Sequence, residues 1–290
     1  KLIGNTPLYH IEDTNIYVKL EKYNIGGSIK DRAVLGMLDA AMNKGEIRQD
    51  TVLVEATSGN TGVALAMLGA VYHIPVIIIM PETMSMERRQ LVKAYGATLV
   101  LTPGEKGMQG AMDEMERLMK ENTNYRSLSQ FDNPDNPNAH YETTGKEILD
   151  QLQDVDIFVA CIGTGGTFSG VAKRLKEYNP AILCVVGVEP AASPLLTEGR
   201  AGPHALQGIG ANFVPANFDR ELADDILLIS DREAVFETVR FAKETGILVG
   251  ISSGANIALA KRLSLRYPGK KIVTVAPDGG EKYLSVLDFD

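Results

Sequence analysis

Short runs of apolar, often β-branched residues alternate with amphipathic helical patterns along almost the whole 290-residue chain. This alternation constrains the fold most, because strands separated by helices pair in parallel and are covered on both faces. The predicted strands are Ile16–Leu20, Thr51–Glu55, Val76–Met80, Thr98–Leu101, Asp156–Ile162, Leu183–Val188, Ile226–Ile229 and Lys271–Val275. The predicted helices lie near residues 30–44, 61–72, 86–95, 107–122, 138–152, 167–178, 232–245 and 254–266. The predicted fold class is α/β, with mainly parallel twisted sheets covered by helices.

The length of the chain is comfortable for two domains. The polar segment SQFDNPDNPNAH is the best boundary, since it is rich in Pro and Asn and divides the chain near its middle. Farther along, TEGRAGPHALQGIGANFVPANFD shows no regular pattern. A long segment of this kind is usually functional or mobile in a compact domain.

Composition excludes several classes of protein. A net charge of −8 and a pI near 5.2 argue against a nucleic-acid surface. No apolar stretch reaches transmembrane length and no signal or transit peptide is visible, although a start at Lys1 suggests a missing short leading segment. Cys161 and Cys184 lie in apolar runs and are expected to be buried, and the four histidines lack metal-ligand spacing. We expect a reduced, cytoplasmic protein with no metal, nucleic-acid partner or membrane association.

A lysine stands between a Gly-Gly-Ser turn and a predicted helix in GGSIKDRA. Apolar residues at helical spacing follow Lys30, and Ser28 lies near the N-cap. The partial positive charge of a helix N-terminus disfavours an ammonium group there. The position therefore suits a neutral amine, for a Schiff base or as a base. On this stretch alone, a solvated side chain remains the alternative.

Gly/Ser/Thr-rich turns follow predicted strands or open helices, where the ligands of α/β sheets collect. EATSGNTG suits a small carboxylate, and GISSGAN opens another helix. At Gly163, a dinucleotide fingerprint would need glycine in place of Phe168, although Glu189 favours it weakly, and a Walker loop would need lysine in place of Val171. What remains there is a nest of N–H groups and threonine hydroxyls sized for one phosphate. A tight strand-to-helix turn is the alternative for each loop.

A single phosphate site, a lysine suited to be neutral and a carboxylate site together match the needs of pyridoxal phosphate. The sequence resembles the cysteine synthase (O-acetylserine sulfhydrylase) and cystathionine β-synthase family, fold type II of the pyridoxal-phosphate enzymes. The resemblance covers nearly the whole chain, through IGNTPL, GGSIKDRA, EATSGNTGVALA, MPETMSMERRQLVKAYGA, QFDNPDNPNAHYETTGKEI, GTGGTFSGV, HALQGIGANFVP, GISSGANIALA and GEKYLS. It implies a tryptophan synthase β-like fold of two domains with the cofactor in the cleft between them. A smaller, mobile domain with the Schiff-base lysine and the substrate loop would span residues 24–134. A larger domain with the phosphate loop would span residues 2–23 and 135–290.

The resemblance also implies a role for each matching residue. Lys30 would be the catalytic residue and would form the internal aldimine. Asn60 would bind the 3′-oxygen of the cofactor and Ser252 would face its pyridine nitrogen. The phosphate would be bound by Gly163, Thr164, Gly165, Gly166 and Thr167. The substrate would be bound by Thr57, Ser58, Gly59, Thr61 and Gln130.

Some acidic residues depart from this pattern or lie outside it. Asp278 stands where many family members carry Ser or Thr, so it could alter the polarity around the pyridine ring. Asp224 and Asp225 are expected to be solvated, and either one is a candidate base toward incoming water or thiol.

The resemblance implies β-replacement through an α-aminoacrylate, with O-acetylserine and sulfide giving cysteine and acetate. Lys30 would move the α-proton. A hydroxyl at the pyridine nitrogen makes a weaker electron sink than a carboxylate, which favours loss of a β-leaving group over transamination. The first alternative is release of sulfide from L-cysteine, with serine, lanthionine or cystathionine as co-product. A serine or threonine dehydratase is less favoured, as are a nicotinamide enzyme and a scaffold without cofactor.

Within the family, GGSIKDRA and FDNPDNPNAHY resemble the second bacterial isozyme, which accepts larger thiols, whereas HALQGIGANFVP resembles the main cysteine synthase. The implied partners are a small amino-acid substrate with sulfide or a thiol, a second copy of the chain in a homodimer, and the C-terminal tail of serine acetyltransferase. No regulatory tail or haem-binding leader of the cystathionine β-synthase type is expected in these residues.

Overall fold

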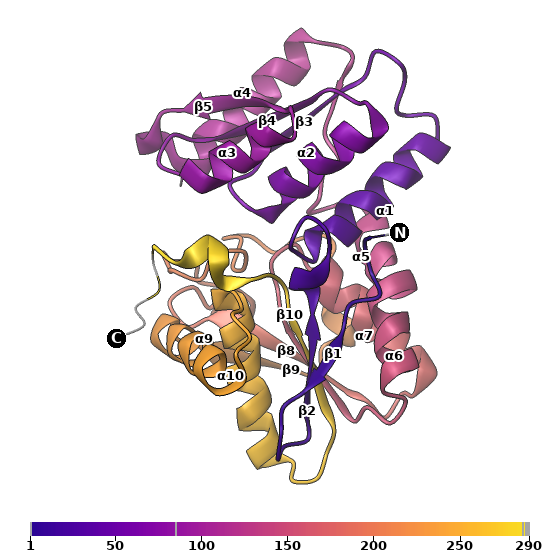
Figure 1. Ribbon diagram of the computed structural model, residues 1–290, viewed down its shortest axis with the longest axis vertical. Helices are drawn as coiled ribbons and strands as arrows, with labels where there is room; N and C mark the ends of the chain where they lie inside the picture. The colour runs from indigo at the N-terminus through magenta and orange to yellow at the C-terminus, as the bar shows by residue number, and fades with distance from the viewer. Residues whose placement is uncertain (1, 85, 286, 288–290) are drawn as a thin grey trace. The chain divides into compact units, whose positions relative to one another are not determined.

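The computed structural model describes residues 2–84, 86–285 and 287 and divides into two compact units (Figure 1). The larger unit comprises Lys1–Ala33 and Phe131–Asp290, and the smaller unit comprises Val34–Gln130. Helix α1 (Lys30–Asn43) begins in the larger unit and continues into the smaller one. Ser85 of the quoted segment MPETMSMERRQLVKAYGA, and residues 286 and 288–290 of the expected larger domain, lie outside the described residues.

The larger unit is built on a sheet with the strand order β1-β2-β10-β7-β8-β9. All neighbouring strands in it are parallel except β1, which pairs antiparallel with β2. The strands are β1 (Leu8–His10), β2 (Ile16–Leu20), β7 (Ile157–Cys161), β8 (Leu183–Pro190), β9 (Asp225–Ile229) and β10 (Ile272–Ala276). Parallel strands whose carboxyl ends meet at one edge place the loops that follow them on the same side of the sheet.

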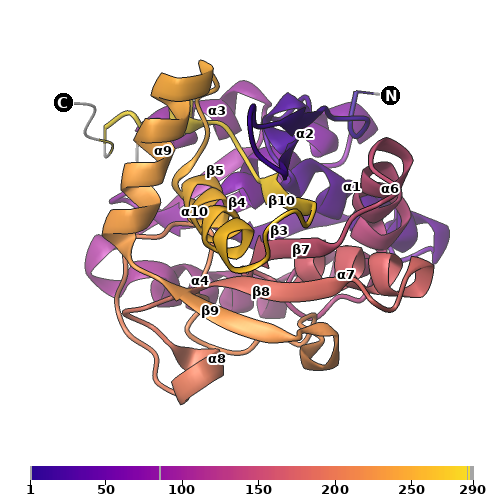
Figure 2. The ribbon, with the colours of Figure 1, turned by 90° about the horizontal axis from the view of Figure 1, so that it is seen from below.

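Helices cover both faces of this sheet, and the alternation of side chains along β7 shows why (Figures 1 and 2). Ile157 and Val159 pack into a core with residues of α9 and α10, whereas Phe158 and Ala160 pack into another core with residues of α7. The helices are α5 (Asp135–Ala139), α6 (Lys146–Gln151), α7 (Gly166–Tyr178), α8 (Leu195–Glu198), α9 (Asp231–Thr245) and α10 (Ile251–Arg266). A π-helix (His140–Gly145) joins α5 to α6, and 3-10 turns occur at Glu21–Tyr23, Arg220–Leu222 and Gly280–Tyr283.

The smaller unit has an all-parallel sheet with the strand order β5-β4-β3-β6. Its strands are β3 (Val52–Ala56), β4 (Val76–Pro81), β5 (Thr98–Thr102) and β6 (Tyr125–Arg126). Its helices are α2 (Asn60–Tyr72), α3 (Met86–Ala94) and α4 (Gly107–Glu121), with a 3-10 turn at Gly104–Lys106. Val54 and Ile79 pack against Ala111 of α4, and α2 is buried over most of its length.

The α/β prediction is confirmed, and every predicted strand is present within two residues of its expected bounds. Three short elements were not predicted: β1, β6 and α8, which have three, two and four residues. Segments this short cannot show a hydrophobic period. The predicted helix 138–152 is divided by the π-helix. Over the described ranges, no helix combines the length and apolar character needed to cross a membrane.

Candidate active site

A glycine-rich loop follows the carboxyl end of β7 and leads into α7. Gly165, the N-cap of α7, has a φ of 84°, in the left-handed region that favours glycine. A Cβ on Gly165 would lie 2.6 Å from the amide nitrogen of Phe218, and one on Gly163 would lie 2.3 Å from the carbonyl oxygen of Gly208. The loop therefore has its shape because these positions carry no side chain.

The N-terminus of α7 fits a phosphate group. The N-cap Gly165 has no side chain to cap this helix, and the amide of Gly166 meets only the neutral Thr164 hydroxyl, at 3.4 Å. The positive end of the helix therefore has no built-in anion. Thr164 lies at the turn, and its hydroxyl accepts a hydrogen bond of 3.1 Å from the Asn136 side chain. The loop thus provides backbone N–H groups and threonine hydroxyls at a helix start, which is the donor set that binds a phosphate.

His140 supports the same loop, although nothing in the sequence marked it out from other histidines. Its side chain is 1% exposed. Nδ1 lies 2.9 Å from the Thr144 hydroxyl and Nε2 lies 3.3 Å from the Thr167 hydroxyl. Burial, with the nearby charges of Lys30 and Arg32, lowers the pKa of His140 well below its usual value. The ring is therefore neutral near pH 7 and orients the Thr167 hydroxyl.

Replacing Gly165 with alanine should weaken cofactor binding by about 10- to 100-fold. The substitution combines left-handed strain with overlap of the Phe218 backbone, at a cost on the order of 1–3 kcal/mol. The matched control is Gly269→Ala, because Gly269 has a similar φ of 79° but nothing within 4 Å of an added Cβ. Equilibrium titration of each apoprotein with pyridoxal phosphate measures the effect. Equal dissociation constants for the two variants would refute the assignment of this loop.

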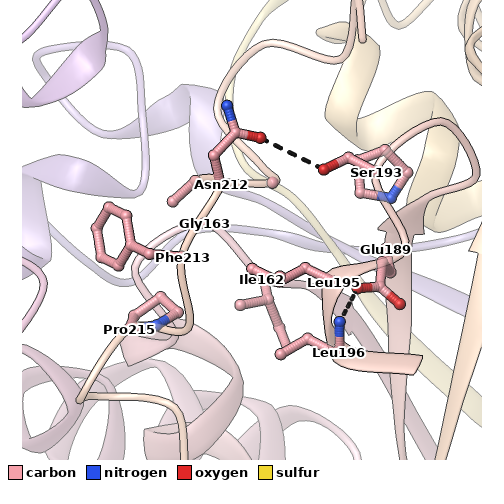
Figure 3. A pocket seen from close by; sticks show the side chains of 12 residues that line it. Ile162, Gly163, Glu189, Ser193, Leu195, Leu196, Asn212, Phe213 and Pro215 are labelled. Atoms are coloured by element: carbon pink, nitrogen blue, oxygen red, sulfur yellow. Dashed lines mark hydrogen bonds between the residues drawn. The ribbon is translucent and has the colours of Figure 1, made fainter. Parts of the chain in front are cut away.

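The long irregular segment predicted as functional packs on this loop. Gly210 N donates to Ile162 O at 3.1 Å. A small pocket lies beside it (Figure 3), lined by Ile162, Gly163, Glu189, Pro190, Ser193, Leu195, Leu196, Gly210, Ala211, Asn212, Phe213 and Pro215. On its wall, Ser193 Oγ donates to Asn212 Oδ1 at 3.3 Å.

Glu189, on the pocket wall, is the residue that weakly favours a dinucleotide-binding site in the sequence. It is 3% exposed, and its carboxylate accepts hydrogen bonds from the backbone amides of Leu196 and Thr197 and from the Thr197 hydroxyl. The carboxylate is thus used to hold α8. This arrangement disfavours a role for Glu189 in binding the ribose of a dinucleotide.

Lys30 is the first residue of α1 and lies in the larger unit. Its backbone amide donates to the Ser28 hydroxyl at 3.2 Å, so Ser28 caps the helix start as the sequence predicts. Burial lowers the pKa of the Lys30 amine, while Cys161, if ionised, and Asp278 act in the opposite direction. A lysine with a lowered pKa is suited to react as a free amine or to act as a base.

A buried ion cluster holds α1 just after Lys30. Arg32 Nε and Nη2 donate to Glu21 at 2.7 and 2.9 Å, and Nη1 and Nη2 donate to Glu147 at 2.6 and 2.7 Å. Lys19 Nζ lies 2.8 Å from Glu147 Oε2. Arg32 is 3% exposed, whereas Glu21 and Lys19 are fully buried. Each charge is compensated, so the cluster fixes the first turn of α1 on the larger unit.

Ser252 lies in the first turn of α10 and is 6% exposed. Gly250 is the N-cap of this helix, and no side chain caps it. The hydroxyl is therefore presented at another uncapped helix start, in the same unit as Lys30 and the Gly163–Thr167 loop. A buried hydroxyl of this kind can donate to or accept from a ring nitrogen.

The expected substrate residues, and Asn60, gather at the N-terminus of α2 in the smaller unit. Thr61 Oγ1 donates to Gln130 Oε1 at 2.8 Å. The N-cap is Gly59, and no side chain caps this helix either. Arg88, which the sequence did not indicate, donates to the carbonyl of Ser58 at 2.9 Å and fixes the turn. This helix start can bind a carboxylate through backbone N–H groups and hydroxyls.

Asp224 and Asp225 lie at the amino end of β9, whereas the Gly163–Thr167 loop follows the carboxyl end of parallel β7. Asp224 accepts from Lys176 Nζ at 2.9 and 2.8 Å and from Cys184 N at 2.6 Å. Asp225 lies 3.5 Å from Arg266. These contacts hold the start of β9, at the end of the parallel strands opposite to the Gly163–Thr167 loop. Neither residue is therefore proposed as a base.

Comparison with known proteins agrees with this geometry. Residues 1–278 match the family model described as pyridoxal-phosphate dependent enzyme. The chain is 46% identical to cysteine synthase B of Campylobacter jejuni, over 98% of this chain and 96% of that one. It is 48% identical to cysteine synthase of Staphylococcus aureus (strain N315), over 100% of this chain and 96% of that one.

Solved structures of other proteins also resemble this chain, both in sequence and in fold. A hydrogen sulfide-producing enzyme of Fusobacterium nucleatum superposes with a TM-score of 0.92 at 48% identity, over 98% of this chain and 96% of that one. Cysteine synthase of Entamoeba histolytica superposes with a TM-score of 0.94 at 41% identity, over 98% of this chain and 88% of that one. The similarity spans both units.

Proposed function

The chain belongs to the pyridoxal-phosphate dependent enzyme family, and from that premise we propose that it is a cysteine synthase. It catalyses β-replacement on O-acetylserine, in which sulfide displaces acetate and cysteine is formed. The observation that carries the proposal is the half-buried Lys30, whose amine has a lowered pKa, in the same unit as the start of α7. The 46% and 48% identities to cysteine synthases support the choice of reaction.

The residues present fit the cofactor. The N–H groups and hydroxyls of Gly163–Thr167 would bind its phosphate, the Lys30 amine would hold it covalently, and Ser252 would face its pyridine nitrogen. Asn60 would bind its 3′-oxygen. When bound, pyridoxal phosphate supplies the electron sink that stabilises negative charge at the substrate α-carbon.

The protein side chains hold the substrate and move its proton. Thr57, Ser58, Gly59, Thr61 and Gln130, at the start of α2, bind the substrate carboxylate with the help of the helix N-terminus. Lys30 Nζ, as a free amine, would take the α-proton of the substrate and later return it. Ser252 offers a hydroxyl rather than a carboxylate to the pyridine nitrogen, which favours loss of the β-acetate over transamination.

Replacing Thr61 with valine should raise the KM for O-acetylserine about tenfold and lower kcat less. Valine has nearly the shape of threonine but lacks the hydroxyl that donates to Gln130 Oε1. The substitution removes the bond that would orient the Gln130 amide toward the substrate carboxylate, and a hydrogen bond to a charged group contributes about 1.5–3 kcal/mol. Steady-state kinetics of the holoenzyme measure the effect. The exposed Thr98→Val serves as the control. A KM for Thr61→Val equal to that of the control would refute this assignment.

A second function has one specific observation in its favour. The Fusobacterium nucleatum structure at 48% identity is that of a hydrogen sulfide-producing enzyme. The same residues could act on L-cysteine, so that sulfide leaves and water, cysteine or homocysteine adds. Serine, lanthionine or cystathionine would then accompany the sulfide.

A donor and acceptor screen tests the proposed function against this second one. O-acetylserine, cysteine and serine are each supplied to the holoenzyme with and without sulfide or homocysteine, and all products are quantified. Cysteine formed from O-acetylserine and sulfide, faster than any other product, is the expected result. Sulfide release from cysteine as the fastest reaction would select the second function, and pyruvate from serine as the sole product would select a dehydratase.

We further propose that the enzyme is a homodimer in a reducing, cytoplasmic setting and that it can bind the C-terminal tail of serine acetyltransferase. The free thiols of Cys161 and Cys184 are compatible with a reducing compartment. Sedimentation of the holoenzyme, with and without a peptide of that tail, tests both forms of association.

A further inference from the structure

Asp278 is a buried carboxylate to which the proposed function assigns no role. It lies just after the carboxyl end of β10 and is 1% exposed. Its Oδ2 accepts a hydrogen bond of 2.7 Å from the hydroxyl of Tyr283, which is itself buried. Its Oδ1 lies against the N-cap of α10, since a Cβ on Gly250 would be only 2.0 Å away. The start of this 16-residue helix and the tyrosine hydroxyl both favour a negative charge here.

The same residue lies directly across from the turn that carries Lys30. Ser28 and Asp278 form an isolated antiparallel bridge. Ile29 N donates to the carbonyl of the neighbouring Pro277 at 2.8 Å. These segments all belong to the larger unit. These backbone contacts therefore fix Asp278 beside the turn that leads into α1.

The charged and titratable groups that act on the Lys30 amine come from three elements. Burial raises the pKa of the Cys161 thiol, at the end of β7, to about 11, so this thiol is neutral near pH 7. His140 is neutral as well, because burial lowers its pKa. Asp278 raises the pKa of the Lys30 amine, against the lowering by burial. Among these three groups, the Asp278 carboxylate is the one whose negative charge can compensate a protonated Lys30.

We propose that Asp278 is a positioning residue for Lys30, whose negative charge stabilises the protonated amine after it has taken the substrate α-proton. The inference rests on the proposed function, in which Lys30 holds that proton until it is returned. An ammonium group buried without a compensating charge is strongly disfavoured. Burial lowers the pKa of Lys30 and so favours the reactive free amine, whereas the charge of Asp278 raises this pKa and favours the protonated form.

The test is the pH dependence of Lys30 reactivity in the apoprotein. Covalent incorporation of pyridoxal phosphate is followed from about pH 6 to 11 as borohydride-fixed label on the Lys30 peptide, quantified by mass spectrometry. Asp278→Asn removes the charge with little change of shape, and Asp278→Ser also relieves crowding against Gly250. In both variants the pH midpoint of Lys30 labelling should fall by about one unit relative to wild type, because removing the negative charge lowers the pKa of the amine. Acetic anhydride labelling of Lys30 gives a second measurement that needs no cofactor.

The matched control is Glu281→Gln, which removes the same charge from the same segment. The Glu281 side chain is 58% exposed and pairs with Lys22. In Glu281→Gln, the pH midpoint of Lys30 labelling should equal that of wild type. An unchanged midpoint in the Asp278 variants, or an equal shift in Glu281→Gln, would overturn the proposal. Label on another lysine in wild type would instead refute the proposed role of Lys30, so the two failures are distinguishable.

Discussion

Lys30→Ala should abolish covalent attachment of pyridoxal phosphate and lower turnover by at least about 10³-fold. General acid–base catalysis alone contributes about 10²- to 10⁴-fold, and this residue also attaches the cofactor. Wild-type holoenzyme should show an absorption band near the visible edge that borohydride removes, leaving label on the Lys30 peptide. The variant should keep its fold, because the Lys30 side chain has no part in the Arg32 ion cluster.

The control for this experiment is Lys173→Ala, which changes an exposed lysine on α7 in the same unit. It should retain the absorption band and the turnover of wild type. Exogenous primary amines should restore part of the activity of Lys30→Ala by supplying the missing base. A fully active Lys30→Ala protein, with label on another lysine, would contradict the assignment.

Arg32→Met should destabilise the protein by about 3–5 kcal/mol, because it removes the cation that pairs with the buried Glu21 and leaves Glu147 paired with Lys19 alone. Urea denaturation of the apoprotein, followed by circular dichroism, measures the change. The control is Arg200→Met, which removes an exposed guanidinium 3.1 Å from Glu198. That change should cost less than about 1 kcal/mol. Equal stabilities of the two variants would contradict the structural role of the cluster.

The same cluster predicts how acid affects stability. Burial raises the pKa of Glu147, but hydrogen bonds from Arg32 and Lys19 outweigh it and lower this pKa from 4.5 to about 2. The stabilisation is therefore complete above about pH 4.5 and is lost as the pH falls toward 2. Glu147→Gln, used as a second arm of the denaturation experiment, should lose this part of the pH dependence.

Much of the fold was predictable because its elements are long enough to show a period. The residues of β7 alternate between the cores on the two faces of the sheet, and such a buried strand is marked by a continuous apolar run. The π-helix at His140–Gly145 was not predictable, since it changes the hydrogen-bond pattern without interrupting the apolar pattern. Helix α8 depends on Glu189, whose carboxylate meets the helix amides only in the folded chain.

The candidate site was predictable where a local turn carries the chemistry. The glycines of the Gly163–Thr167 loop and the lysine at the start of α1 have a local physical reason that the sequence already shows. By contrast, the contacts of His140 with Thr167, and of Arg88 with Ser58, join residues distant in sequence. Asp224 and Asp225 are expected from the sequence to be solvated, with a role as base as the alternative. Their adjacency in sequence to the long irregular segment does not show that they lie at the amino end of β9.

The most direct test of cysteine synthesis is the fate of isotopically heavy sulfide. Holoenzyme is incubated with O-acetylserine and ³⁴S-sulfide, and the amino-acid products are analysed by mass spectrometry while acetate is quantified. The account predicts ³⁴S-cysteine and acetate in equal amounts, at a rate that Lys30→Ala lowers by at least about 10³-fold. Pyruvate and ammonia without labelled cysteine, or labelled cysteine formed equally fast by Lys30→Ala, would contradict it.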